Sequence, residues 1–197
     1  MINISAIILA SGKSTRFHSN KLLYKVNLKP VISYVIDNVS KSNFQERIIV
    51  LRNKEIEKYS IDKGFKTVWN KDFEKGMSTS IVHGIENISP NSDAAMIIPG
   101  DMPLLDPSAL NGLIEYYKSS GKGISGFINN GTIISPVIFS RQYFEEIFEL
   151  KGDKGAKSIV LIHDNDFSGM EISSNILIDI DTRDDVIQFR KFLNHKD

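Results

Sequence analysis

The feature that most constrains this chain is a regular alternation between short apolar runs and longer stretches with helical spacing. The first run, Ile4–Ala10, is apolar apart from Ser5, which is typical of a strand buried on both faces. Similar runs recur at residues 47–51, 66–69 and 93–99. Between them, apolar residues at every third or fourth position predict helices. Repeated strand–helix units predict an α/β fold with a parallel sheet and right-handed crossovers.

The starts of several helices can be predicted in this alternating part. Pro30 is placed to begin the first helix, and a polar helix follows at residues 54–61. Ser78 or Thr79 is placed to cap the next one. Residues 106–107 are an aspartate and a proline, which predict a cap and a first-turn proline for another helix.

The second half of the chain departs from this pattern. Residues 121–131 hold four glycines and two asparagines, which predict loops and short strands. Further strands are predicted at residues 132–139, 170–172 and 176–180, and helices at residues 142–150 and 154–163. Thr182 is placed to cap a last helix, with Asp185 in its first turn near the positive dipole end. No repeat or linker interrupts the chain, so residues 1–197 are expected to form a single domain.

Composition and charge disfavour several classes of function. Lys plus Arg and Asp plus Glu both number 24, so no overall charge attracts nucleic acid or a membrane surface. The absence of cysteine removes disulfides and thiolate metal sites, and the four histidines lack metal-ligand spacing. The apolar start is too short to span a bilayer and lacks the basic residues of a signal peptide. A cytoplasmic protein is therefore expected.

The sharpest local signal is the polar loop after the first strand. It reads Leu9-Ala10-Ser11-Gly12-Lys13-Ser14-Thr15-Arg16, with Lys21 just beyond it. A glycine here lets the backbone approach a ligand, and Arg16 and Lys21 supply positive charge for a triphosphate. A Walker A loop would need glycine where Ile7 stands, and the dinucleotide fingerprint needs three glycines, so both folds are disfavoured. An ordinary polar turn is the alternative.

Acidic residues follow two of the predicted strands. Gly100 and Asp101 end the fourth apolar run, which places a carboxylate at the carboxyl edge of the sheet. Mg²⁺ typically takes one or two carboxylates together with substrate phosphates. Asp179 and Asp181 would share one face of a closing strand, where a cation would relieve their repulsion. The alternatives are a turn for Asp101 and a helix cap for Asp181.

A third polar segment runs from Asn70 to Ser80. Gly76 precedes hydroxyl residues at a predicted helix start, a geometry that can hydrogen-bond a base, ribose or phosphate. Simple helix capping is the alternative. Capping explains the hydroxyls but leaves Gly76 and Asn70 without a role.

In their order along the chain, these segments resemble the motifs of the MobA-like nucleotidyltransferase family. The matching segments are the opening loop with Lys21-Leu22-Leu23, Asn70 with Gly76-Met77-Ser78-Thr79-Ser80, Gly100-Asp101-Met102-Pro103 and Asp179-Ile180-Asp181-Thr182. Residues 152–156 resemble a segment typical of the molybdenum cofactor cytidylyltransferases, the most similar branch. Ser11 stands where that branch usually has alanine and the guanylyl branch usually has glycine, so the choice of base stays open.

The resemblance implies a three-layer Rossmann-like nucleotidyltransferase fold, with a mostly parallel sheet and helices on both faces. It implies transfer of CMP from CTP to the phosphate of molybdopterin or molybdenum cofactor, with GTP as the alternative donor. Arg16, Lys21 and Asp101 would be catalytic, and Mg²⁺ or Mn²⁺ would bind Asp101 with Asp181 or Asp179. The nucleotide would contact Leu9, Ala10, Ser11, Gly12, Lys13, Arg16, Lys21, Asn70, Gly76, Ser80 and Gly100.

Two other functions remain open. The family usually has other residues at Phe17-His18 and at Ser135, which favours a different phosphorylated acceptor such as a sugar phosphate. A cofactor-binding chaperone without catalysis is the second, and the presence of Arg16, Lys21 and Asp101 argues against it. A molybdoenzyme or its chaperone would be the partner that receives the product.

Overall fold

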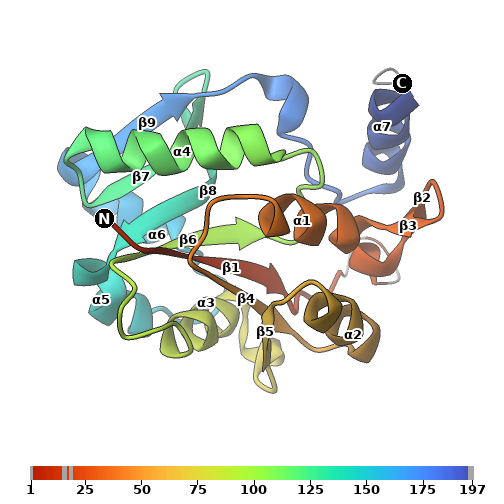
Figure 1. The fold of residues 1–197 in the computed structure, drawn as a ribbon, viewed down its shortest axis with the longest axis horizontal. Helices are drawn as coiled ribbons and strands as arrows, with labels where there is room; N and C mark the ends of the chain where they lie inside the picture. The colour runs from red at the N-terminus through yellow and green to blue at the C-terminus, as the bar shows by residue number, and fades with distance from the viewer. Residues whose placement is uncertain (1, 15–16, 18–19, 195–197) are drawn as a thin grey trace.

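The computed structural model describes residues 2–14, 17 and 20–194. Its centre is a seven-stranded sheet in the order β5-β4-β1-β6-β8-β7-β9 (Figure 1). The strands are β1 (Ile4–Ala10), β4 (Glu46–Leu51), β5 (Lys66–Trp69), β6 (Ala94–Pro99), β7 (Ile124–Asn129), β8 (Thr132–Ser140) and β9 (Phe167–Glu171). Only the pairings of β8 with β6 and β7 are antiparallel among the described strands of this sheet. The expected mostly parallel sheet is therefore confirmed.

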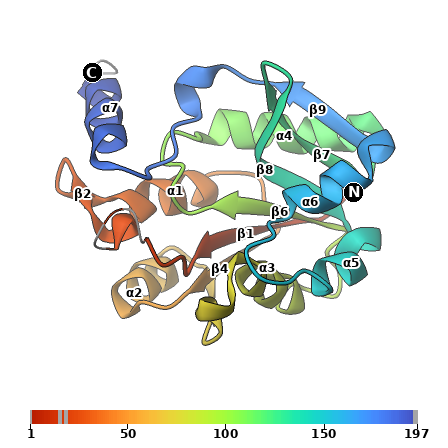
Figure 2. The same ribbon diagram turned by 180° about the vertical axis from the view of Figure 1, so that it is seen from behind.

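Helices cover both faces of this sheet, which gives the three expected layers (Figures 1 and 2). One face packs against α1 (Val31–Ser40), α2 (Lys54–Asp62) and α4 (Pro107–Ser120). The other face packs against α3 (Met77–Glu86), α5 (Phe144–Phe148) and α6 (Lys157–Ile162). Alternate residues of β1 serve the two faces, since Ile8 lies in the first core and Ile7 in the second. A strand covered on both sides has to be apolar throughout, as the sequence of β1 is.

A smaller apolar cluster joins the last helix, α7 (Arg183–Asn194), to the region before α1. It packs Phe189 of α7 against Tyr34 of α1, with ring centroids 5.0 Å apart. The same cluster includes Val26 of a small hairpin made of β2 (Lys25–Val26) and β3 (Lys29–Pro30). No helix in the described part of the chain is long and apolar enough to cross a membrane.

Two helix starts follow their predicted local signals. Asp106 Oδ1 accepts a hydrogen bond of 3.0 Å from the backbone N–H of Ala109, and Pro107 is the first residue of α4. At α7, the backbone N–H of Thr182 donates to Asp185 Oδ2 at 2.7 Å. Both arrangements satisfy backbone groups at a helix end, which is what the capping residues predict.

Two predictions of local structure are wrong. Neither Ser78 nor Thr79 caps α3, because the helix begins at Met77 with Gly76 as its N-cap. Residues 176–180 do not form a strand, although they are apolar enough to suggest one. The N–H of Ile180 donates to the backbone oxygen of Asp101 at 2.9 Å, and its side chain is buried against α7. An apolar run predicts burial, but pairing with a neighbouring strand depends on where the chain lies.

Candidate active site

Most of the described residues predicted for the site gather at the carboxyl edge of three neighbouring parallel strands. Strand β1 lies between β4 and β6, with Ala10 opposite Leu51 and Leu9 opposite Pro99. The segments that follow these strands therefore leave the sheet side by side (Figure 1). Ligands of open α/β sheets bind at this edge.

The glycine after β6 brings the opening loop and the acidic segment together. The N–H of Gly100 donates to the backbone oxygen of Leu9 at 3.0 Å. A Cβ atom on Gly100 would lie only 2.7 Å from that oxygen and 3.0 Å from Cδ1 of Ile32. Glycine is therefore required for this close approach, which fixes the position of the next residue, Asp101.

Lys21 connects two acidic residues that come from distant parts of the chain. Its Nζ lies 2.6 Å from Oδ2 of Asp101 and 2.7 Å from Oδ1 of Asp181. Burial alone would lower the pKa of Lys21, but the carboxylates of Asp101 and Asp181 raise it on balance. The lysine is therefore held in its charged form between two predicted metal ligands.

Among the described residues, this region carries more negative than positive charge. Loss of solvent around the carboxyl group, together with the carboxylates of Asp101 and Asp181, raises the pKa of Asp179 to about 6, although the residue as a whole is exposed. Three acidic residues thus act on one lysine, Lys21. Carboxylate oxygens are suitable ligands for a hard divalent cation. The structure brings Asp179 and Asp181 here through the loop before α7, and not through the predicted strand.

The residues fit a cation that is shared with a nucleotide. Within the described ranges, no group of three or more acidic or histidine side chains forms a metal cage on its own. Two carboxylates are, however, what a Mg²⁺ ion needs when phosphate oxygens complete its coordination. Asp101 and Asp181 supply that number.

Beneath the opening loop lies a buried network of hydroxyl and amide groups. Ser11 Oγ and Ser80 Oγ are 2.5 Å apart, and Asn70 Nδ2 donates to both oxygens at 3.1 Å. The same amide donates to Thr79 Oγ1 at 2.9 Å. Ser11, Asn70 and Ser80 are 1, 2 and 5% exposed, so they support the loop from within. The structure thus brings together three of the residues predicted to bind nucleotide.

Gly76 faces another segment of the chain. Its φ angle is 112°, and a Cβ atom would lie 2.2 Å from the backbone carbon of Gly152. The oxygen of Gly152 accepts a hydrogen bond of 3.0 Å from the N–H of Ser78, and Asp153 Oδ1 accepts one of 3.3 Å from Met77. This second segment satisfies backbone N–H groups in the first turn of α3, which explains why no hydroxyl of α3 caps it.

The remaining loop residues differ in what they offer a ligand. The side chains of Leu9 and Ala10 pack into the two cores, so only their backbone groups can face the site. A Cβ atom on Gly12 would meet nothing within 4 Å, and Lys13 Nζ donates to the oxygen of Glu74 at 3.3 Å. Arg16, the remaining predicted catalytic residue, lies outside the described residues.

Arg52 was not predicted from the sequence, although it lies at the same edge. It is the first residue after β4, and its Nη2 donates to the backbone oxygen of Gly12 at 3.3 Å. A charged residue within two positions of the end of a buried strand is the signal that singled out Asp101 after β6. The same rule applied to β4 would have found Arg52.

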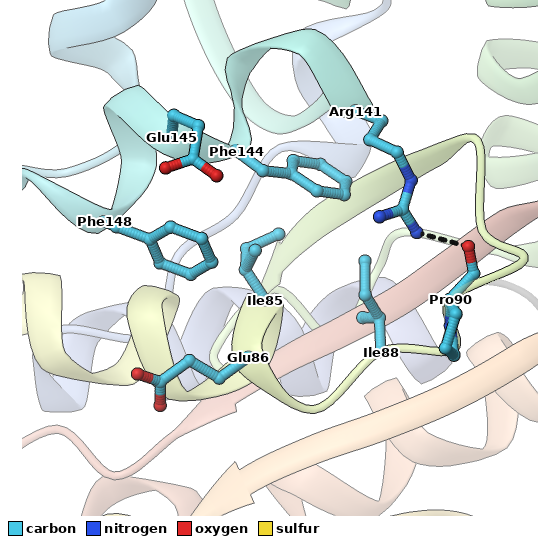
Figure 3. Close-up of a pocket in the computed structure, with 8 residues that line it drawn as sticks. All are labelled: Ile85, Glu86, Ile88, Pro90, Arg141, Phe144, Glu145 and Phe148. Atoms are coloured by element: carbon cyan, nitrogen blue, oxygen red, sulfur yellow. Dashed lines mark hydrogen bonds between the residues drawn. The ribbon is translucent and has the colours of Figure 1, made fainter.

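A hollow of about 300 Å³ lies elsewhere, between α3 and α5 (Figure 3). Ile88 and Phe148 are among the residues that line it. Arg141, also in its wall, donates to the backbone oxygen of Pro90 at 2.8 Å. Pro90 precedes β6, so this hollow lies at the amino edge of that strand and includes none of the predicted site residues.

Comparison with known proteins identifies relatives over most of the chain. The family described as a MobA-like NTP transferase domain matches residues 6–166. A "probable molybdenum cofactor guanylyltransferase" of Thermococcus sibiricus is 32% identical over 58% of this chain, and the match spans 56% of that relative's length. A protein of the same description from Natranaerobius thermophilus is 27% identical, with 97% of both chains covered.

Solved structures agree on the fold. The manganese complex of Rv0371C from Mycobacterium tuberculosis H37Rv superimposes with a TM-score of 0.80 at 23% identity, covering 98% of both chains. At that identity the similarity establishes the fold alone. The expected Rossmann-like architecture is thereby confirmed.

Proposed function

The chain belongs to the MobA-like NTP transferase family, and on this premise we propose that it transfers a nucleoside monophosphate from an NTP to the phosphate of a molybdopterin-type cofactor. The observation that carries the proposal is the meeting of Lys21, Asp101 and Asp181 beside the opening loop. The names of both relatives support the acceptor.

The chemistry needs little from a general base. A phosphate monoester is largely ionised at neutral pH, so its oxygen can attack the α-phosphorus of the NTP directly. The bond between the α-phosphorus and the bridging oxygen then breaks, and pyrophosphate leaves. Positioning and charge neutralisation can supply the catalysis.

In this proposal, the residues predicted for the site divide these tasks. Lys21 would hold oxygens of the triphosphate as a point charge, and Arg16 would join it from the opening loop. Asp101 and Asp181 would hold Mg²⁺ or Mn²⁺, and the manganese complex of the structural neighbour supports a divalent cation. When bound, the cation neutralises charge on the triphosphate and on the leaving pyrophosphate.

Two nucleotides are candidates for the donor. GTP is the first, because both relatives are named guanylyltransferases. CTP is the second, because residues 152–156 resemble the cytidylyl branch and pack on the first turn of α3 beside Gly76. The relatives thus move the expectation from CTP towards GTP.

A turnover matrix tests the proposal. The protein would be incubated with Mg²⁺, each of the four NTPs, and either molybdopterin cofactor or a panel of sugar phosphates, and pyrophosphate would be measured. We expect release only with GTP or CTP in the presence of the molybdopterin acceptor. Exclusive turnover of a sugar phosphate would show that the acceptor is a sugar phosphate and not a molybdopterin. The absence of pyrophosphate from every pair, despite NTP binding, would instead favour a non-catalytic cofactor-binding chaperone.

A further inference from the structure

Arg52 lies between two segments that the proposed function assigns to the nucleotide. It follows Leu51, the last residue of β4, which is paired with Ala10 at the end of β1. The backbone oxygen of Leu51 also accepts a hydrogen bond of 2.8 Å from the N–H of Asn70. Arg52 therefore leaves the sheet with Ser11 on one side and Asn70 on the other.

Its guanidinium group ties the opening loop to a neighbouring turn. The carbon Cζ lies 4.5 Å from the centre of the Phe73 ring, while Nη2 donates to the oxygen of Gly12. Phe73 begins the 3₁₀ turn Phe73–Lys75, and Lys13 contacts the same turn through its hydrogen bond to Glu74. A planar cation stacked on an aromatic ring is held in a defined orientation.

Most of the donors of Arg52 are still available. A guanidinium has five N–H groups, and one hydrogen bond, to Gly12, is found among the described residues. The Nε atom is buried and has no hydrogen-bond partner. No carboxylate of the described residues forms an ion pair with Arg52. The remaining N–H groups of Nη1 and Nη2, on a side chain that is only half-buried, are therefore the donors available to a ligand acceptor.

The order of the strands separates Arg52 from the phosphate side of the site. β1 lies between β4 and β6, so Arg52 and Asp101 follow strands on opposite sides of the opening loop. Two strand spacings amount to about 10 Å, which is the scale of the distance between the base and the triphosphate of a nucleotide. Arg52 accordingly lies on the side of Asn70 and Ser11, and Lys21 on the side of the acidic residues.

We propose that Arg52 is a specificity-determining residue, which fixes the loop at Gly12 and donates hydrogen bonds to the acceptor edge of the nucleobase. The proposal rests on the proposed function and deepens it. Guanine offers O6 and N7 as adjacent acceptors, and cytosine offers O2 and N3, whereas adenine places an amino donor beside N7. An arginine here therefore favours GTP or CTP over ATP.

Nucleotide binding without an acceptor tests this role. The affinities of GTP, CTP, ATP and inorganic tripolyphosphate would be measured by calorimetry for the wild type, Arg52→Ala and Arg52→Lys. We expect Arg52→Ala to lower the affinity for the preferred NTP by about tenfold or more. The ratio of this affinity to the affinity for ATP should fall as well. Tripolyphosphate has no base, so its affinity should fall less than that of the preferred NTP.

Matched variants separate this role from a merely structural one. Arg47 lies on the same strand and likewise donates to backbone oxygens, those of Val39 and Ser42. Arg47→Ala should keep the NTP affinity, because the residue lies near the opposite end of β4. Arg52→Lys keeps the charge but lacks the planar fork, so it should show the same base-selective loss if Arg52→Ala does not fold.

Three results would overturn the inference. Unchanged NTP affinity in both Arg52 variants would show that Arg52 does not contact the nucleobase, while the proposed function would stand. An equal loss for tripolyphosphate would assign Arg52 to the phosphates. A wild-type protein that binds none of the NTPs would contradict the proposed function and this inference together.

Discussion

The side-chain nitrogen of Lys21 lies 2.6 Å from Oδ2 of Asp101, although 80 residues separate the two in the sequence. They meet because Lys21 follows the loop after β1 and Asp101 follows the neighbouring strand β6. The lysine thereby occupies oxygens that the proposed function gives to a divalent cation. A lysine and a metal ion would compete for these oxygens, and nucleotide phosphates would give the lysine other partners.

Replacement of Lys21 by methionine should have opposite effects on the two ligands. NTP affinity is expected to fall by about ten- to a hundredfold, since a charge-assisted hydrogen bond is worth about 1.5–3 kcal/mol. Mn²⁺ affinity without nucleotide should rise, because the ammonium no longer competes for Asp101 and Asp181. Calorimetry and Mn²⁺ electron paramagnetic resonance measure the two. Lys25→Met, on the exposed edge of β2, is the control, and unchanged NTP affinity in Lys21→Met would count against the loop assignment.

Replacement of Asp101 by asparagine should remove turnover and spare metal-free NTP binding. Loss of a metal ligand forfeits several kcal/mol of transition-state stabilisation, so pyrophosphate release should fall by about a hundredfold or more. Asp106→Asn is a matched control five residues further on, because asparagine also caps a helix well. Full turnover in Asp101→Asn would mean that this carboxylate holds no catalytic metal.

The two loop glycines should respond differently to alanine. Gly76→Ala would place a methyl group against Gly152 at a φ of 112°, and we expect a loss of at least about 2 kcal/mol in the free energy of unfolding. Gly12→Ala meets no neighbouring atom, so it should stay within about 0.5 kcal/mol of wild type while NTP binding weakens. Thermal unfolding and NTP titration measure both. Equal stability of the two variants would contradict the packing at Gly76.

The tip of the β2–β3 hairpin offers a stabilising substitution. Leu28 is 92% exposed and has a φ of +64°, where a side chain is disfavoured and glycine is usual in this kind of turn. Leu28→Gly should raise the free energy of unfolding by about 0.5–1 kcal/mol, after allowance for the greater freedom of glycine in the unfolded chain. Leu28→Ala keeps the conformational penalty and is the control. A Leu28→Gly protein less stable than Leu28→Ala would reveal a stabilising contact of the leucine.

Asp37 should make stability depend on pH at the acid end. Burial alone would raise its pKa, but hydrogen bonds from Lys29, Lys63 and Tyr59 lower it on balance below the ordinary value of 3.8. Its contribution to stability is therefore complete above the unfolded-state pKa and is lost as pH falls through the folded-state value. Asp37→Asn should be less stable than wild type at pH 7, with a difference that shrinks below pH 3.8. Chemical denaturation across this range measures the effect, and a constant difference would contradict it.

Most of the alternating part of the fold was predictable, because its signals are local. A continuous apolar run such as Ile4–Ala10 must be covered on both faces, and Asp106 satisfies backbone donors only three residues away. The same logic pointed to Asp101, since a polar residue just beyond the end of a buried strand has to emerge at the edge of the sheet. Arg52 obeys this rule too, but no motif drew attention to it.

The sequence by itself determined where the buried strands of the alternating part fall along the chain, most helix starts and the family motifs around Lys21 and Asp101. Only the tertiary structure decided that Asp181 contacts Lys21 across 160 residues of sequence. It also decided that the oxygen of Gly152 accepts a hydrogen bond from the first turn of α3, and that residues 176–180 form no strand. Periodicity and capping act over a few residues, whereas these contacts depend on how whole elements pack. The pairing of Lys21 with two carboxylates is therefore a property of the folded chain.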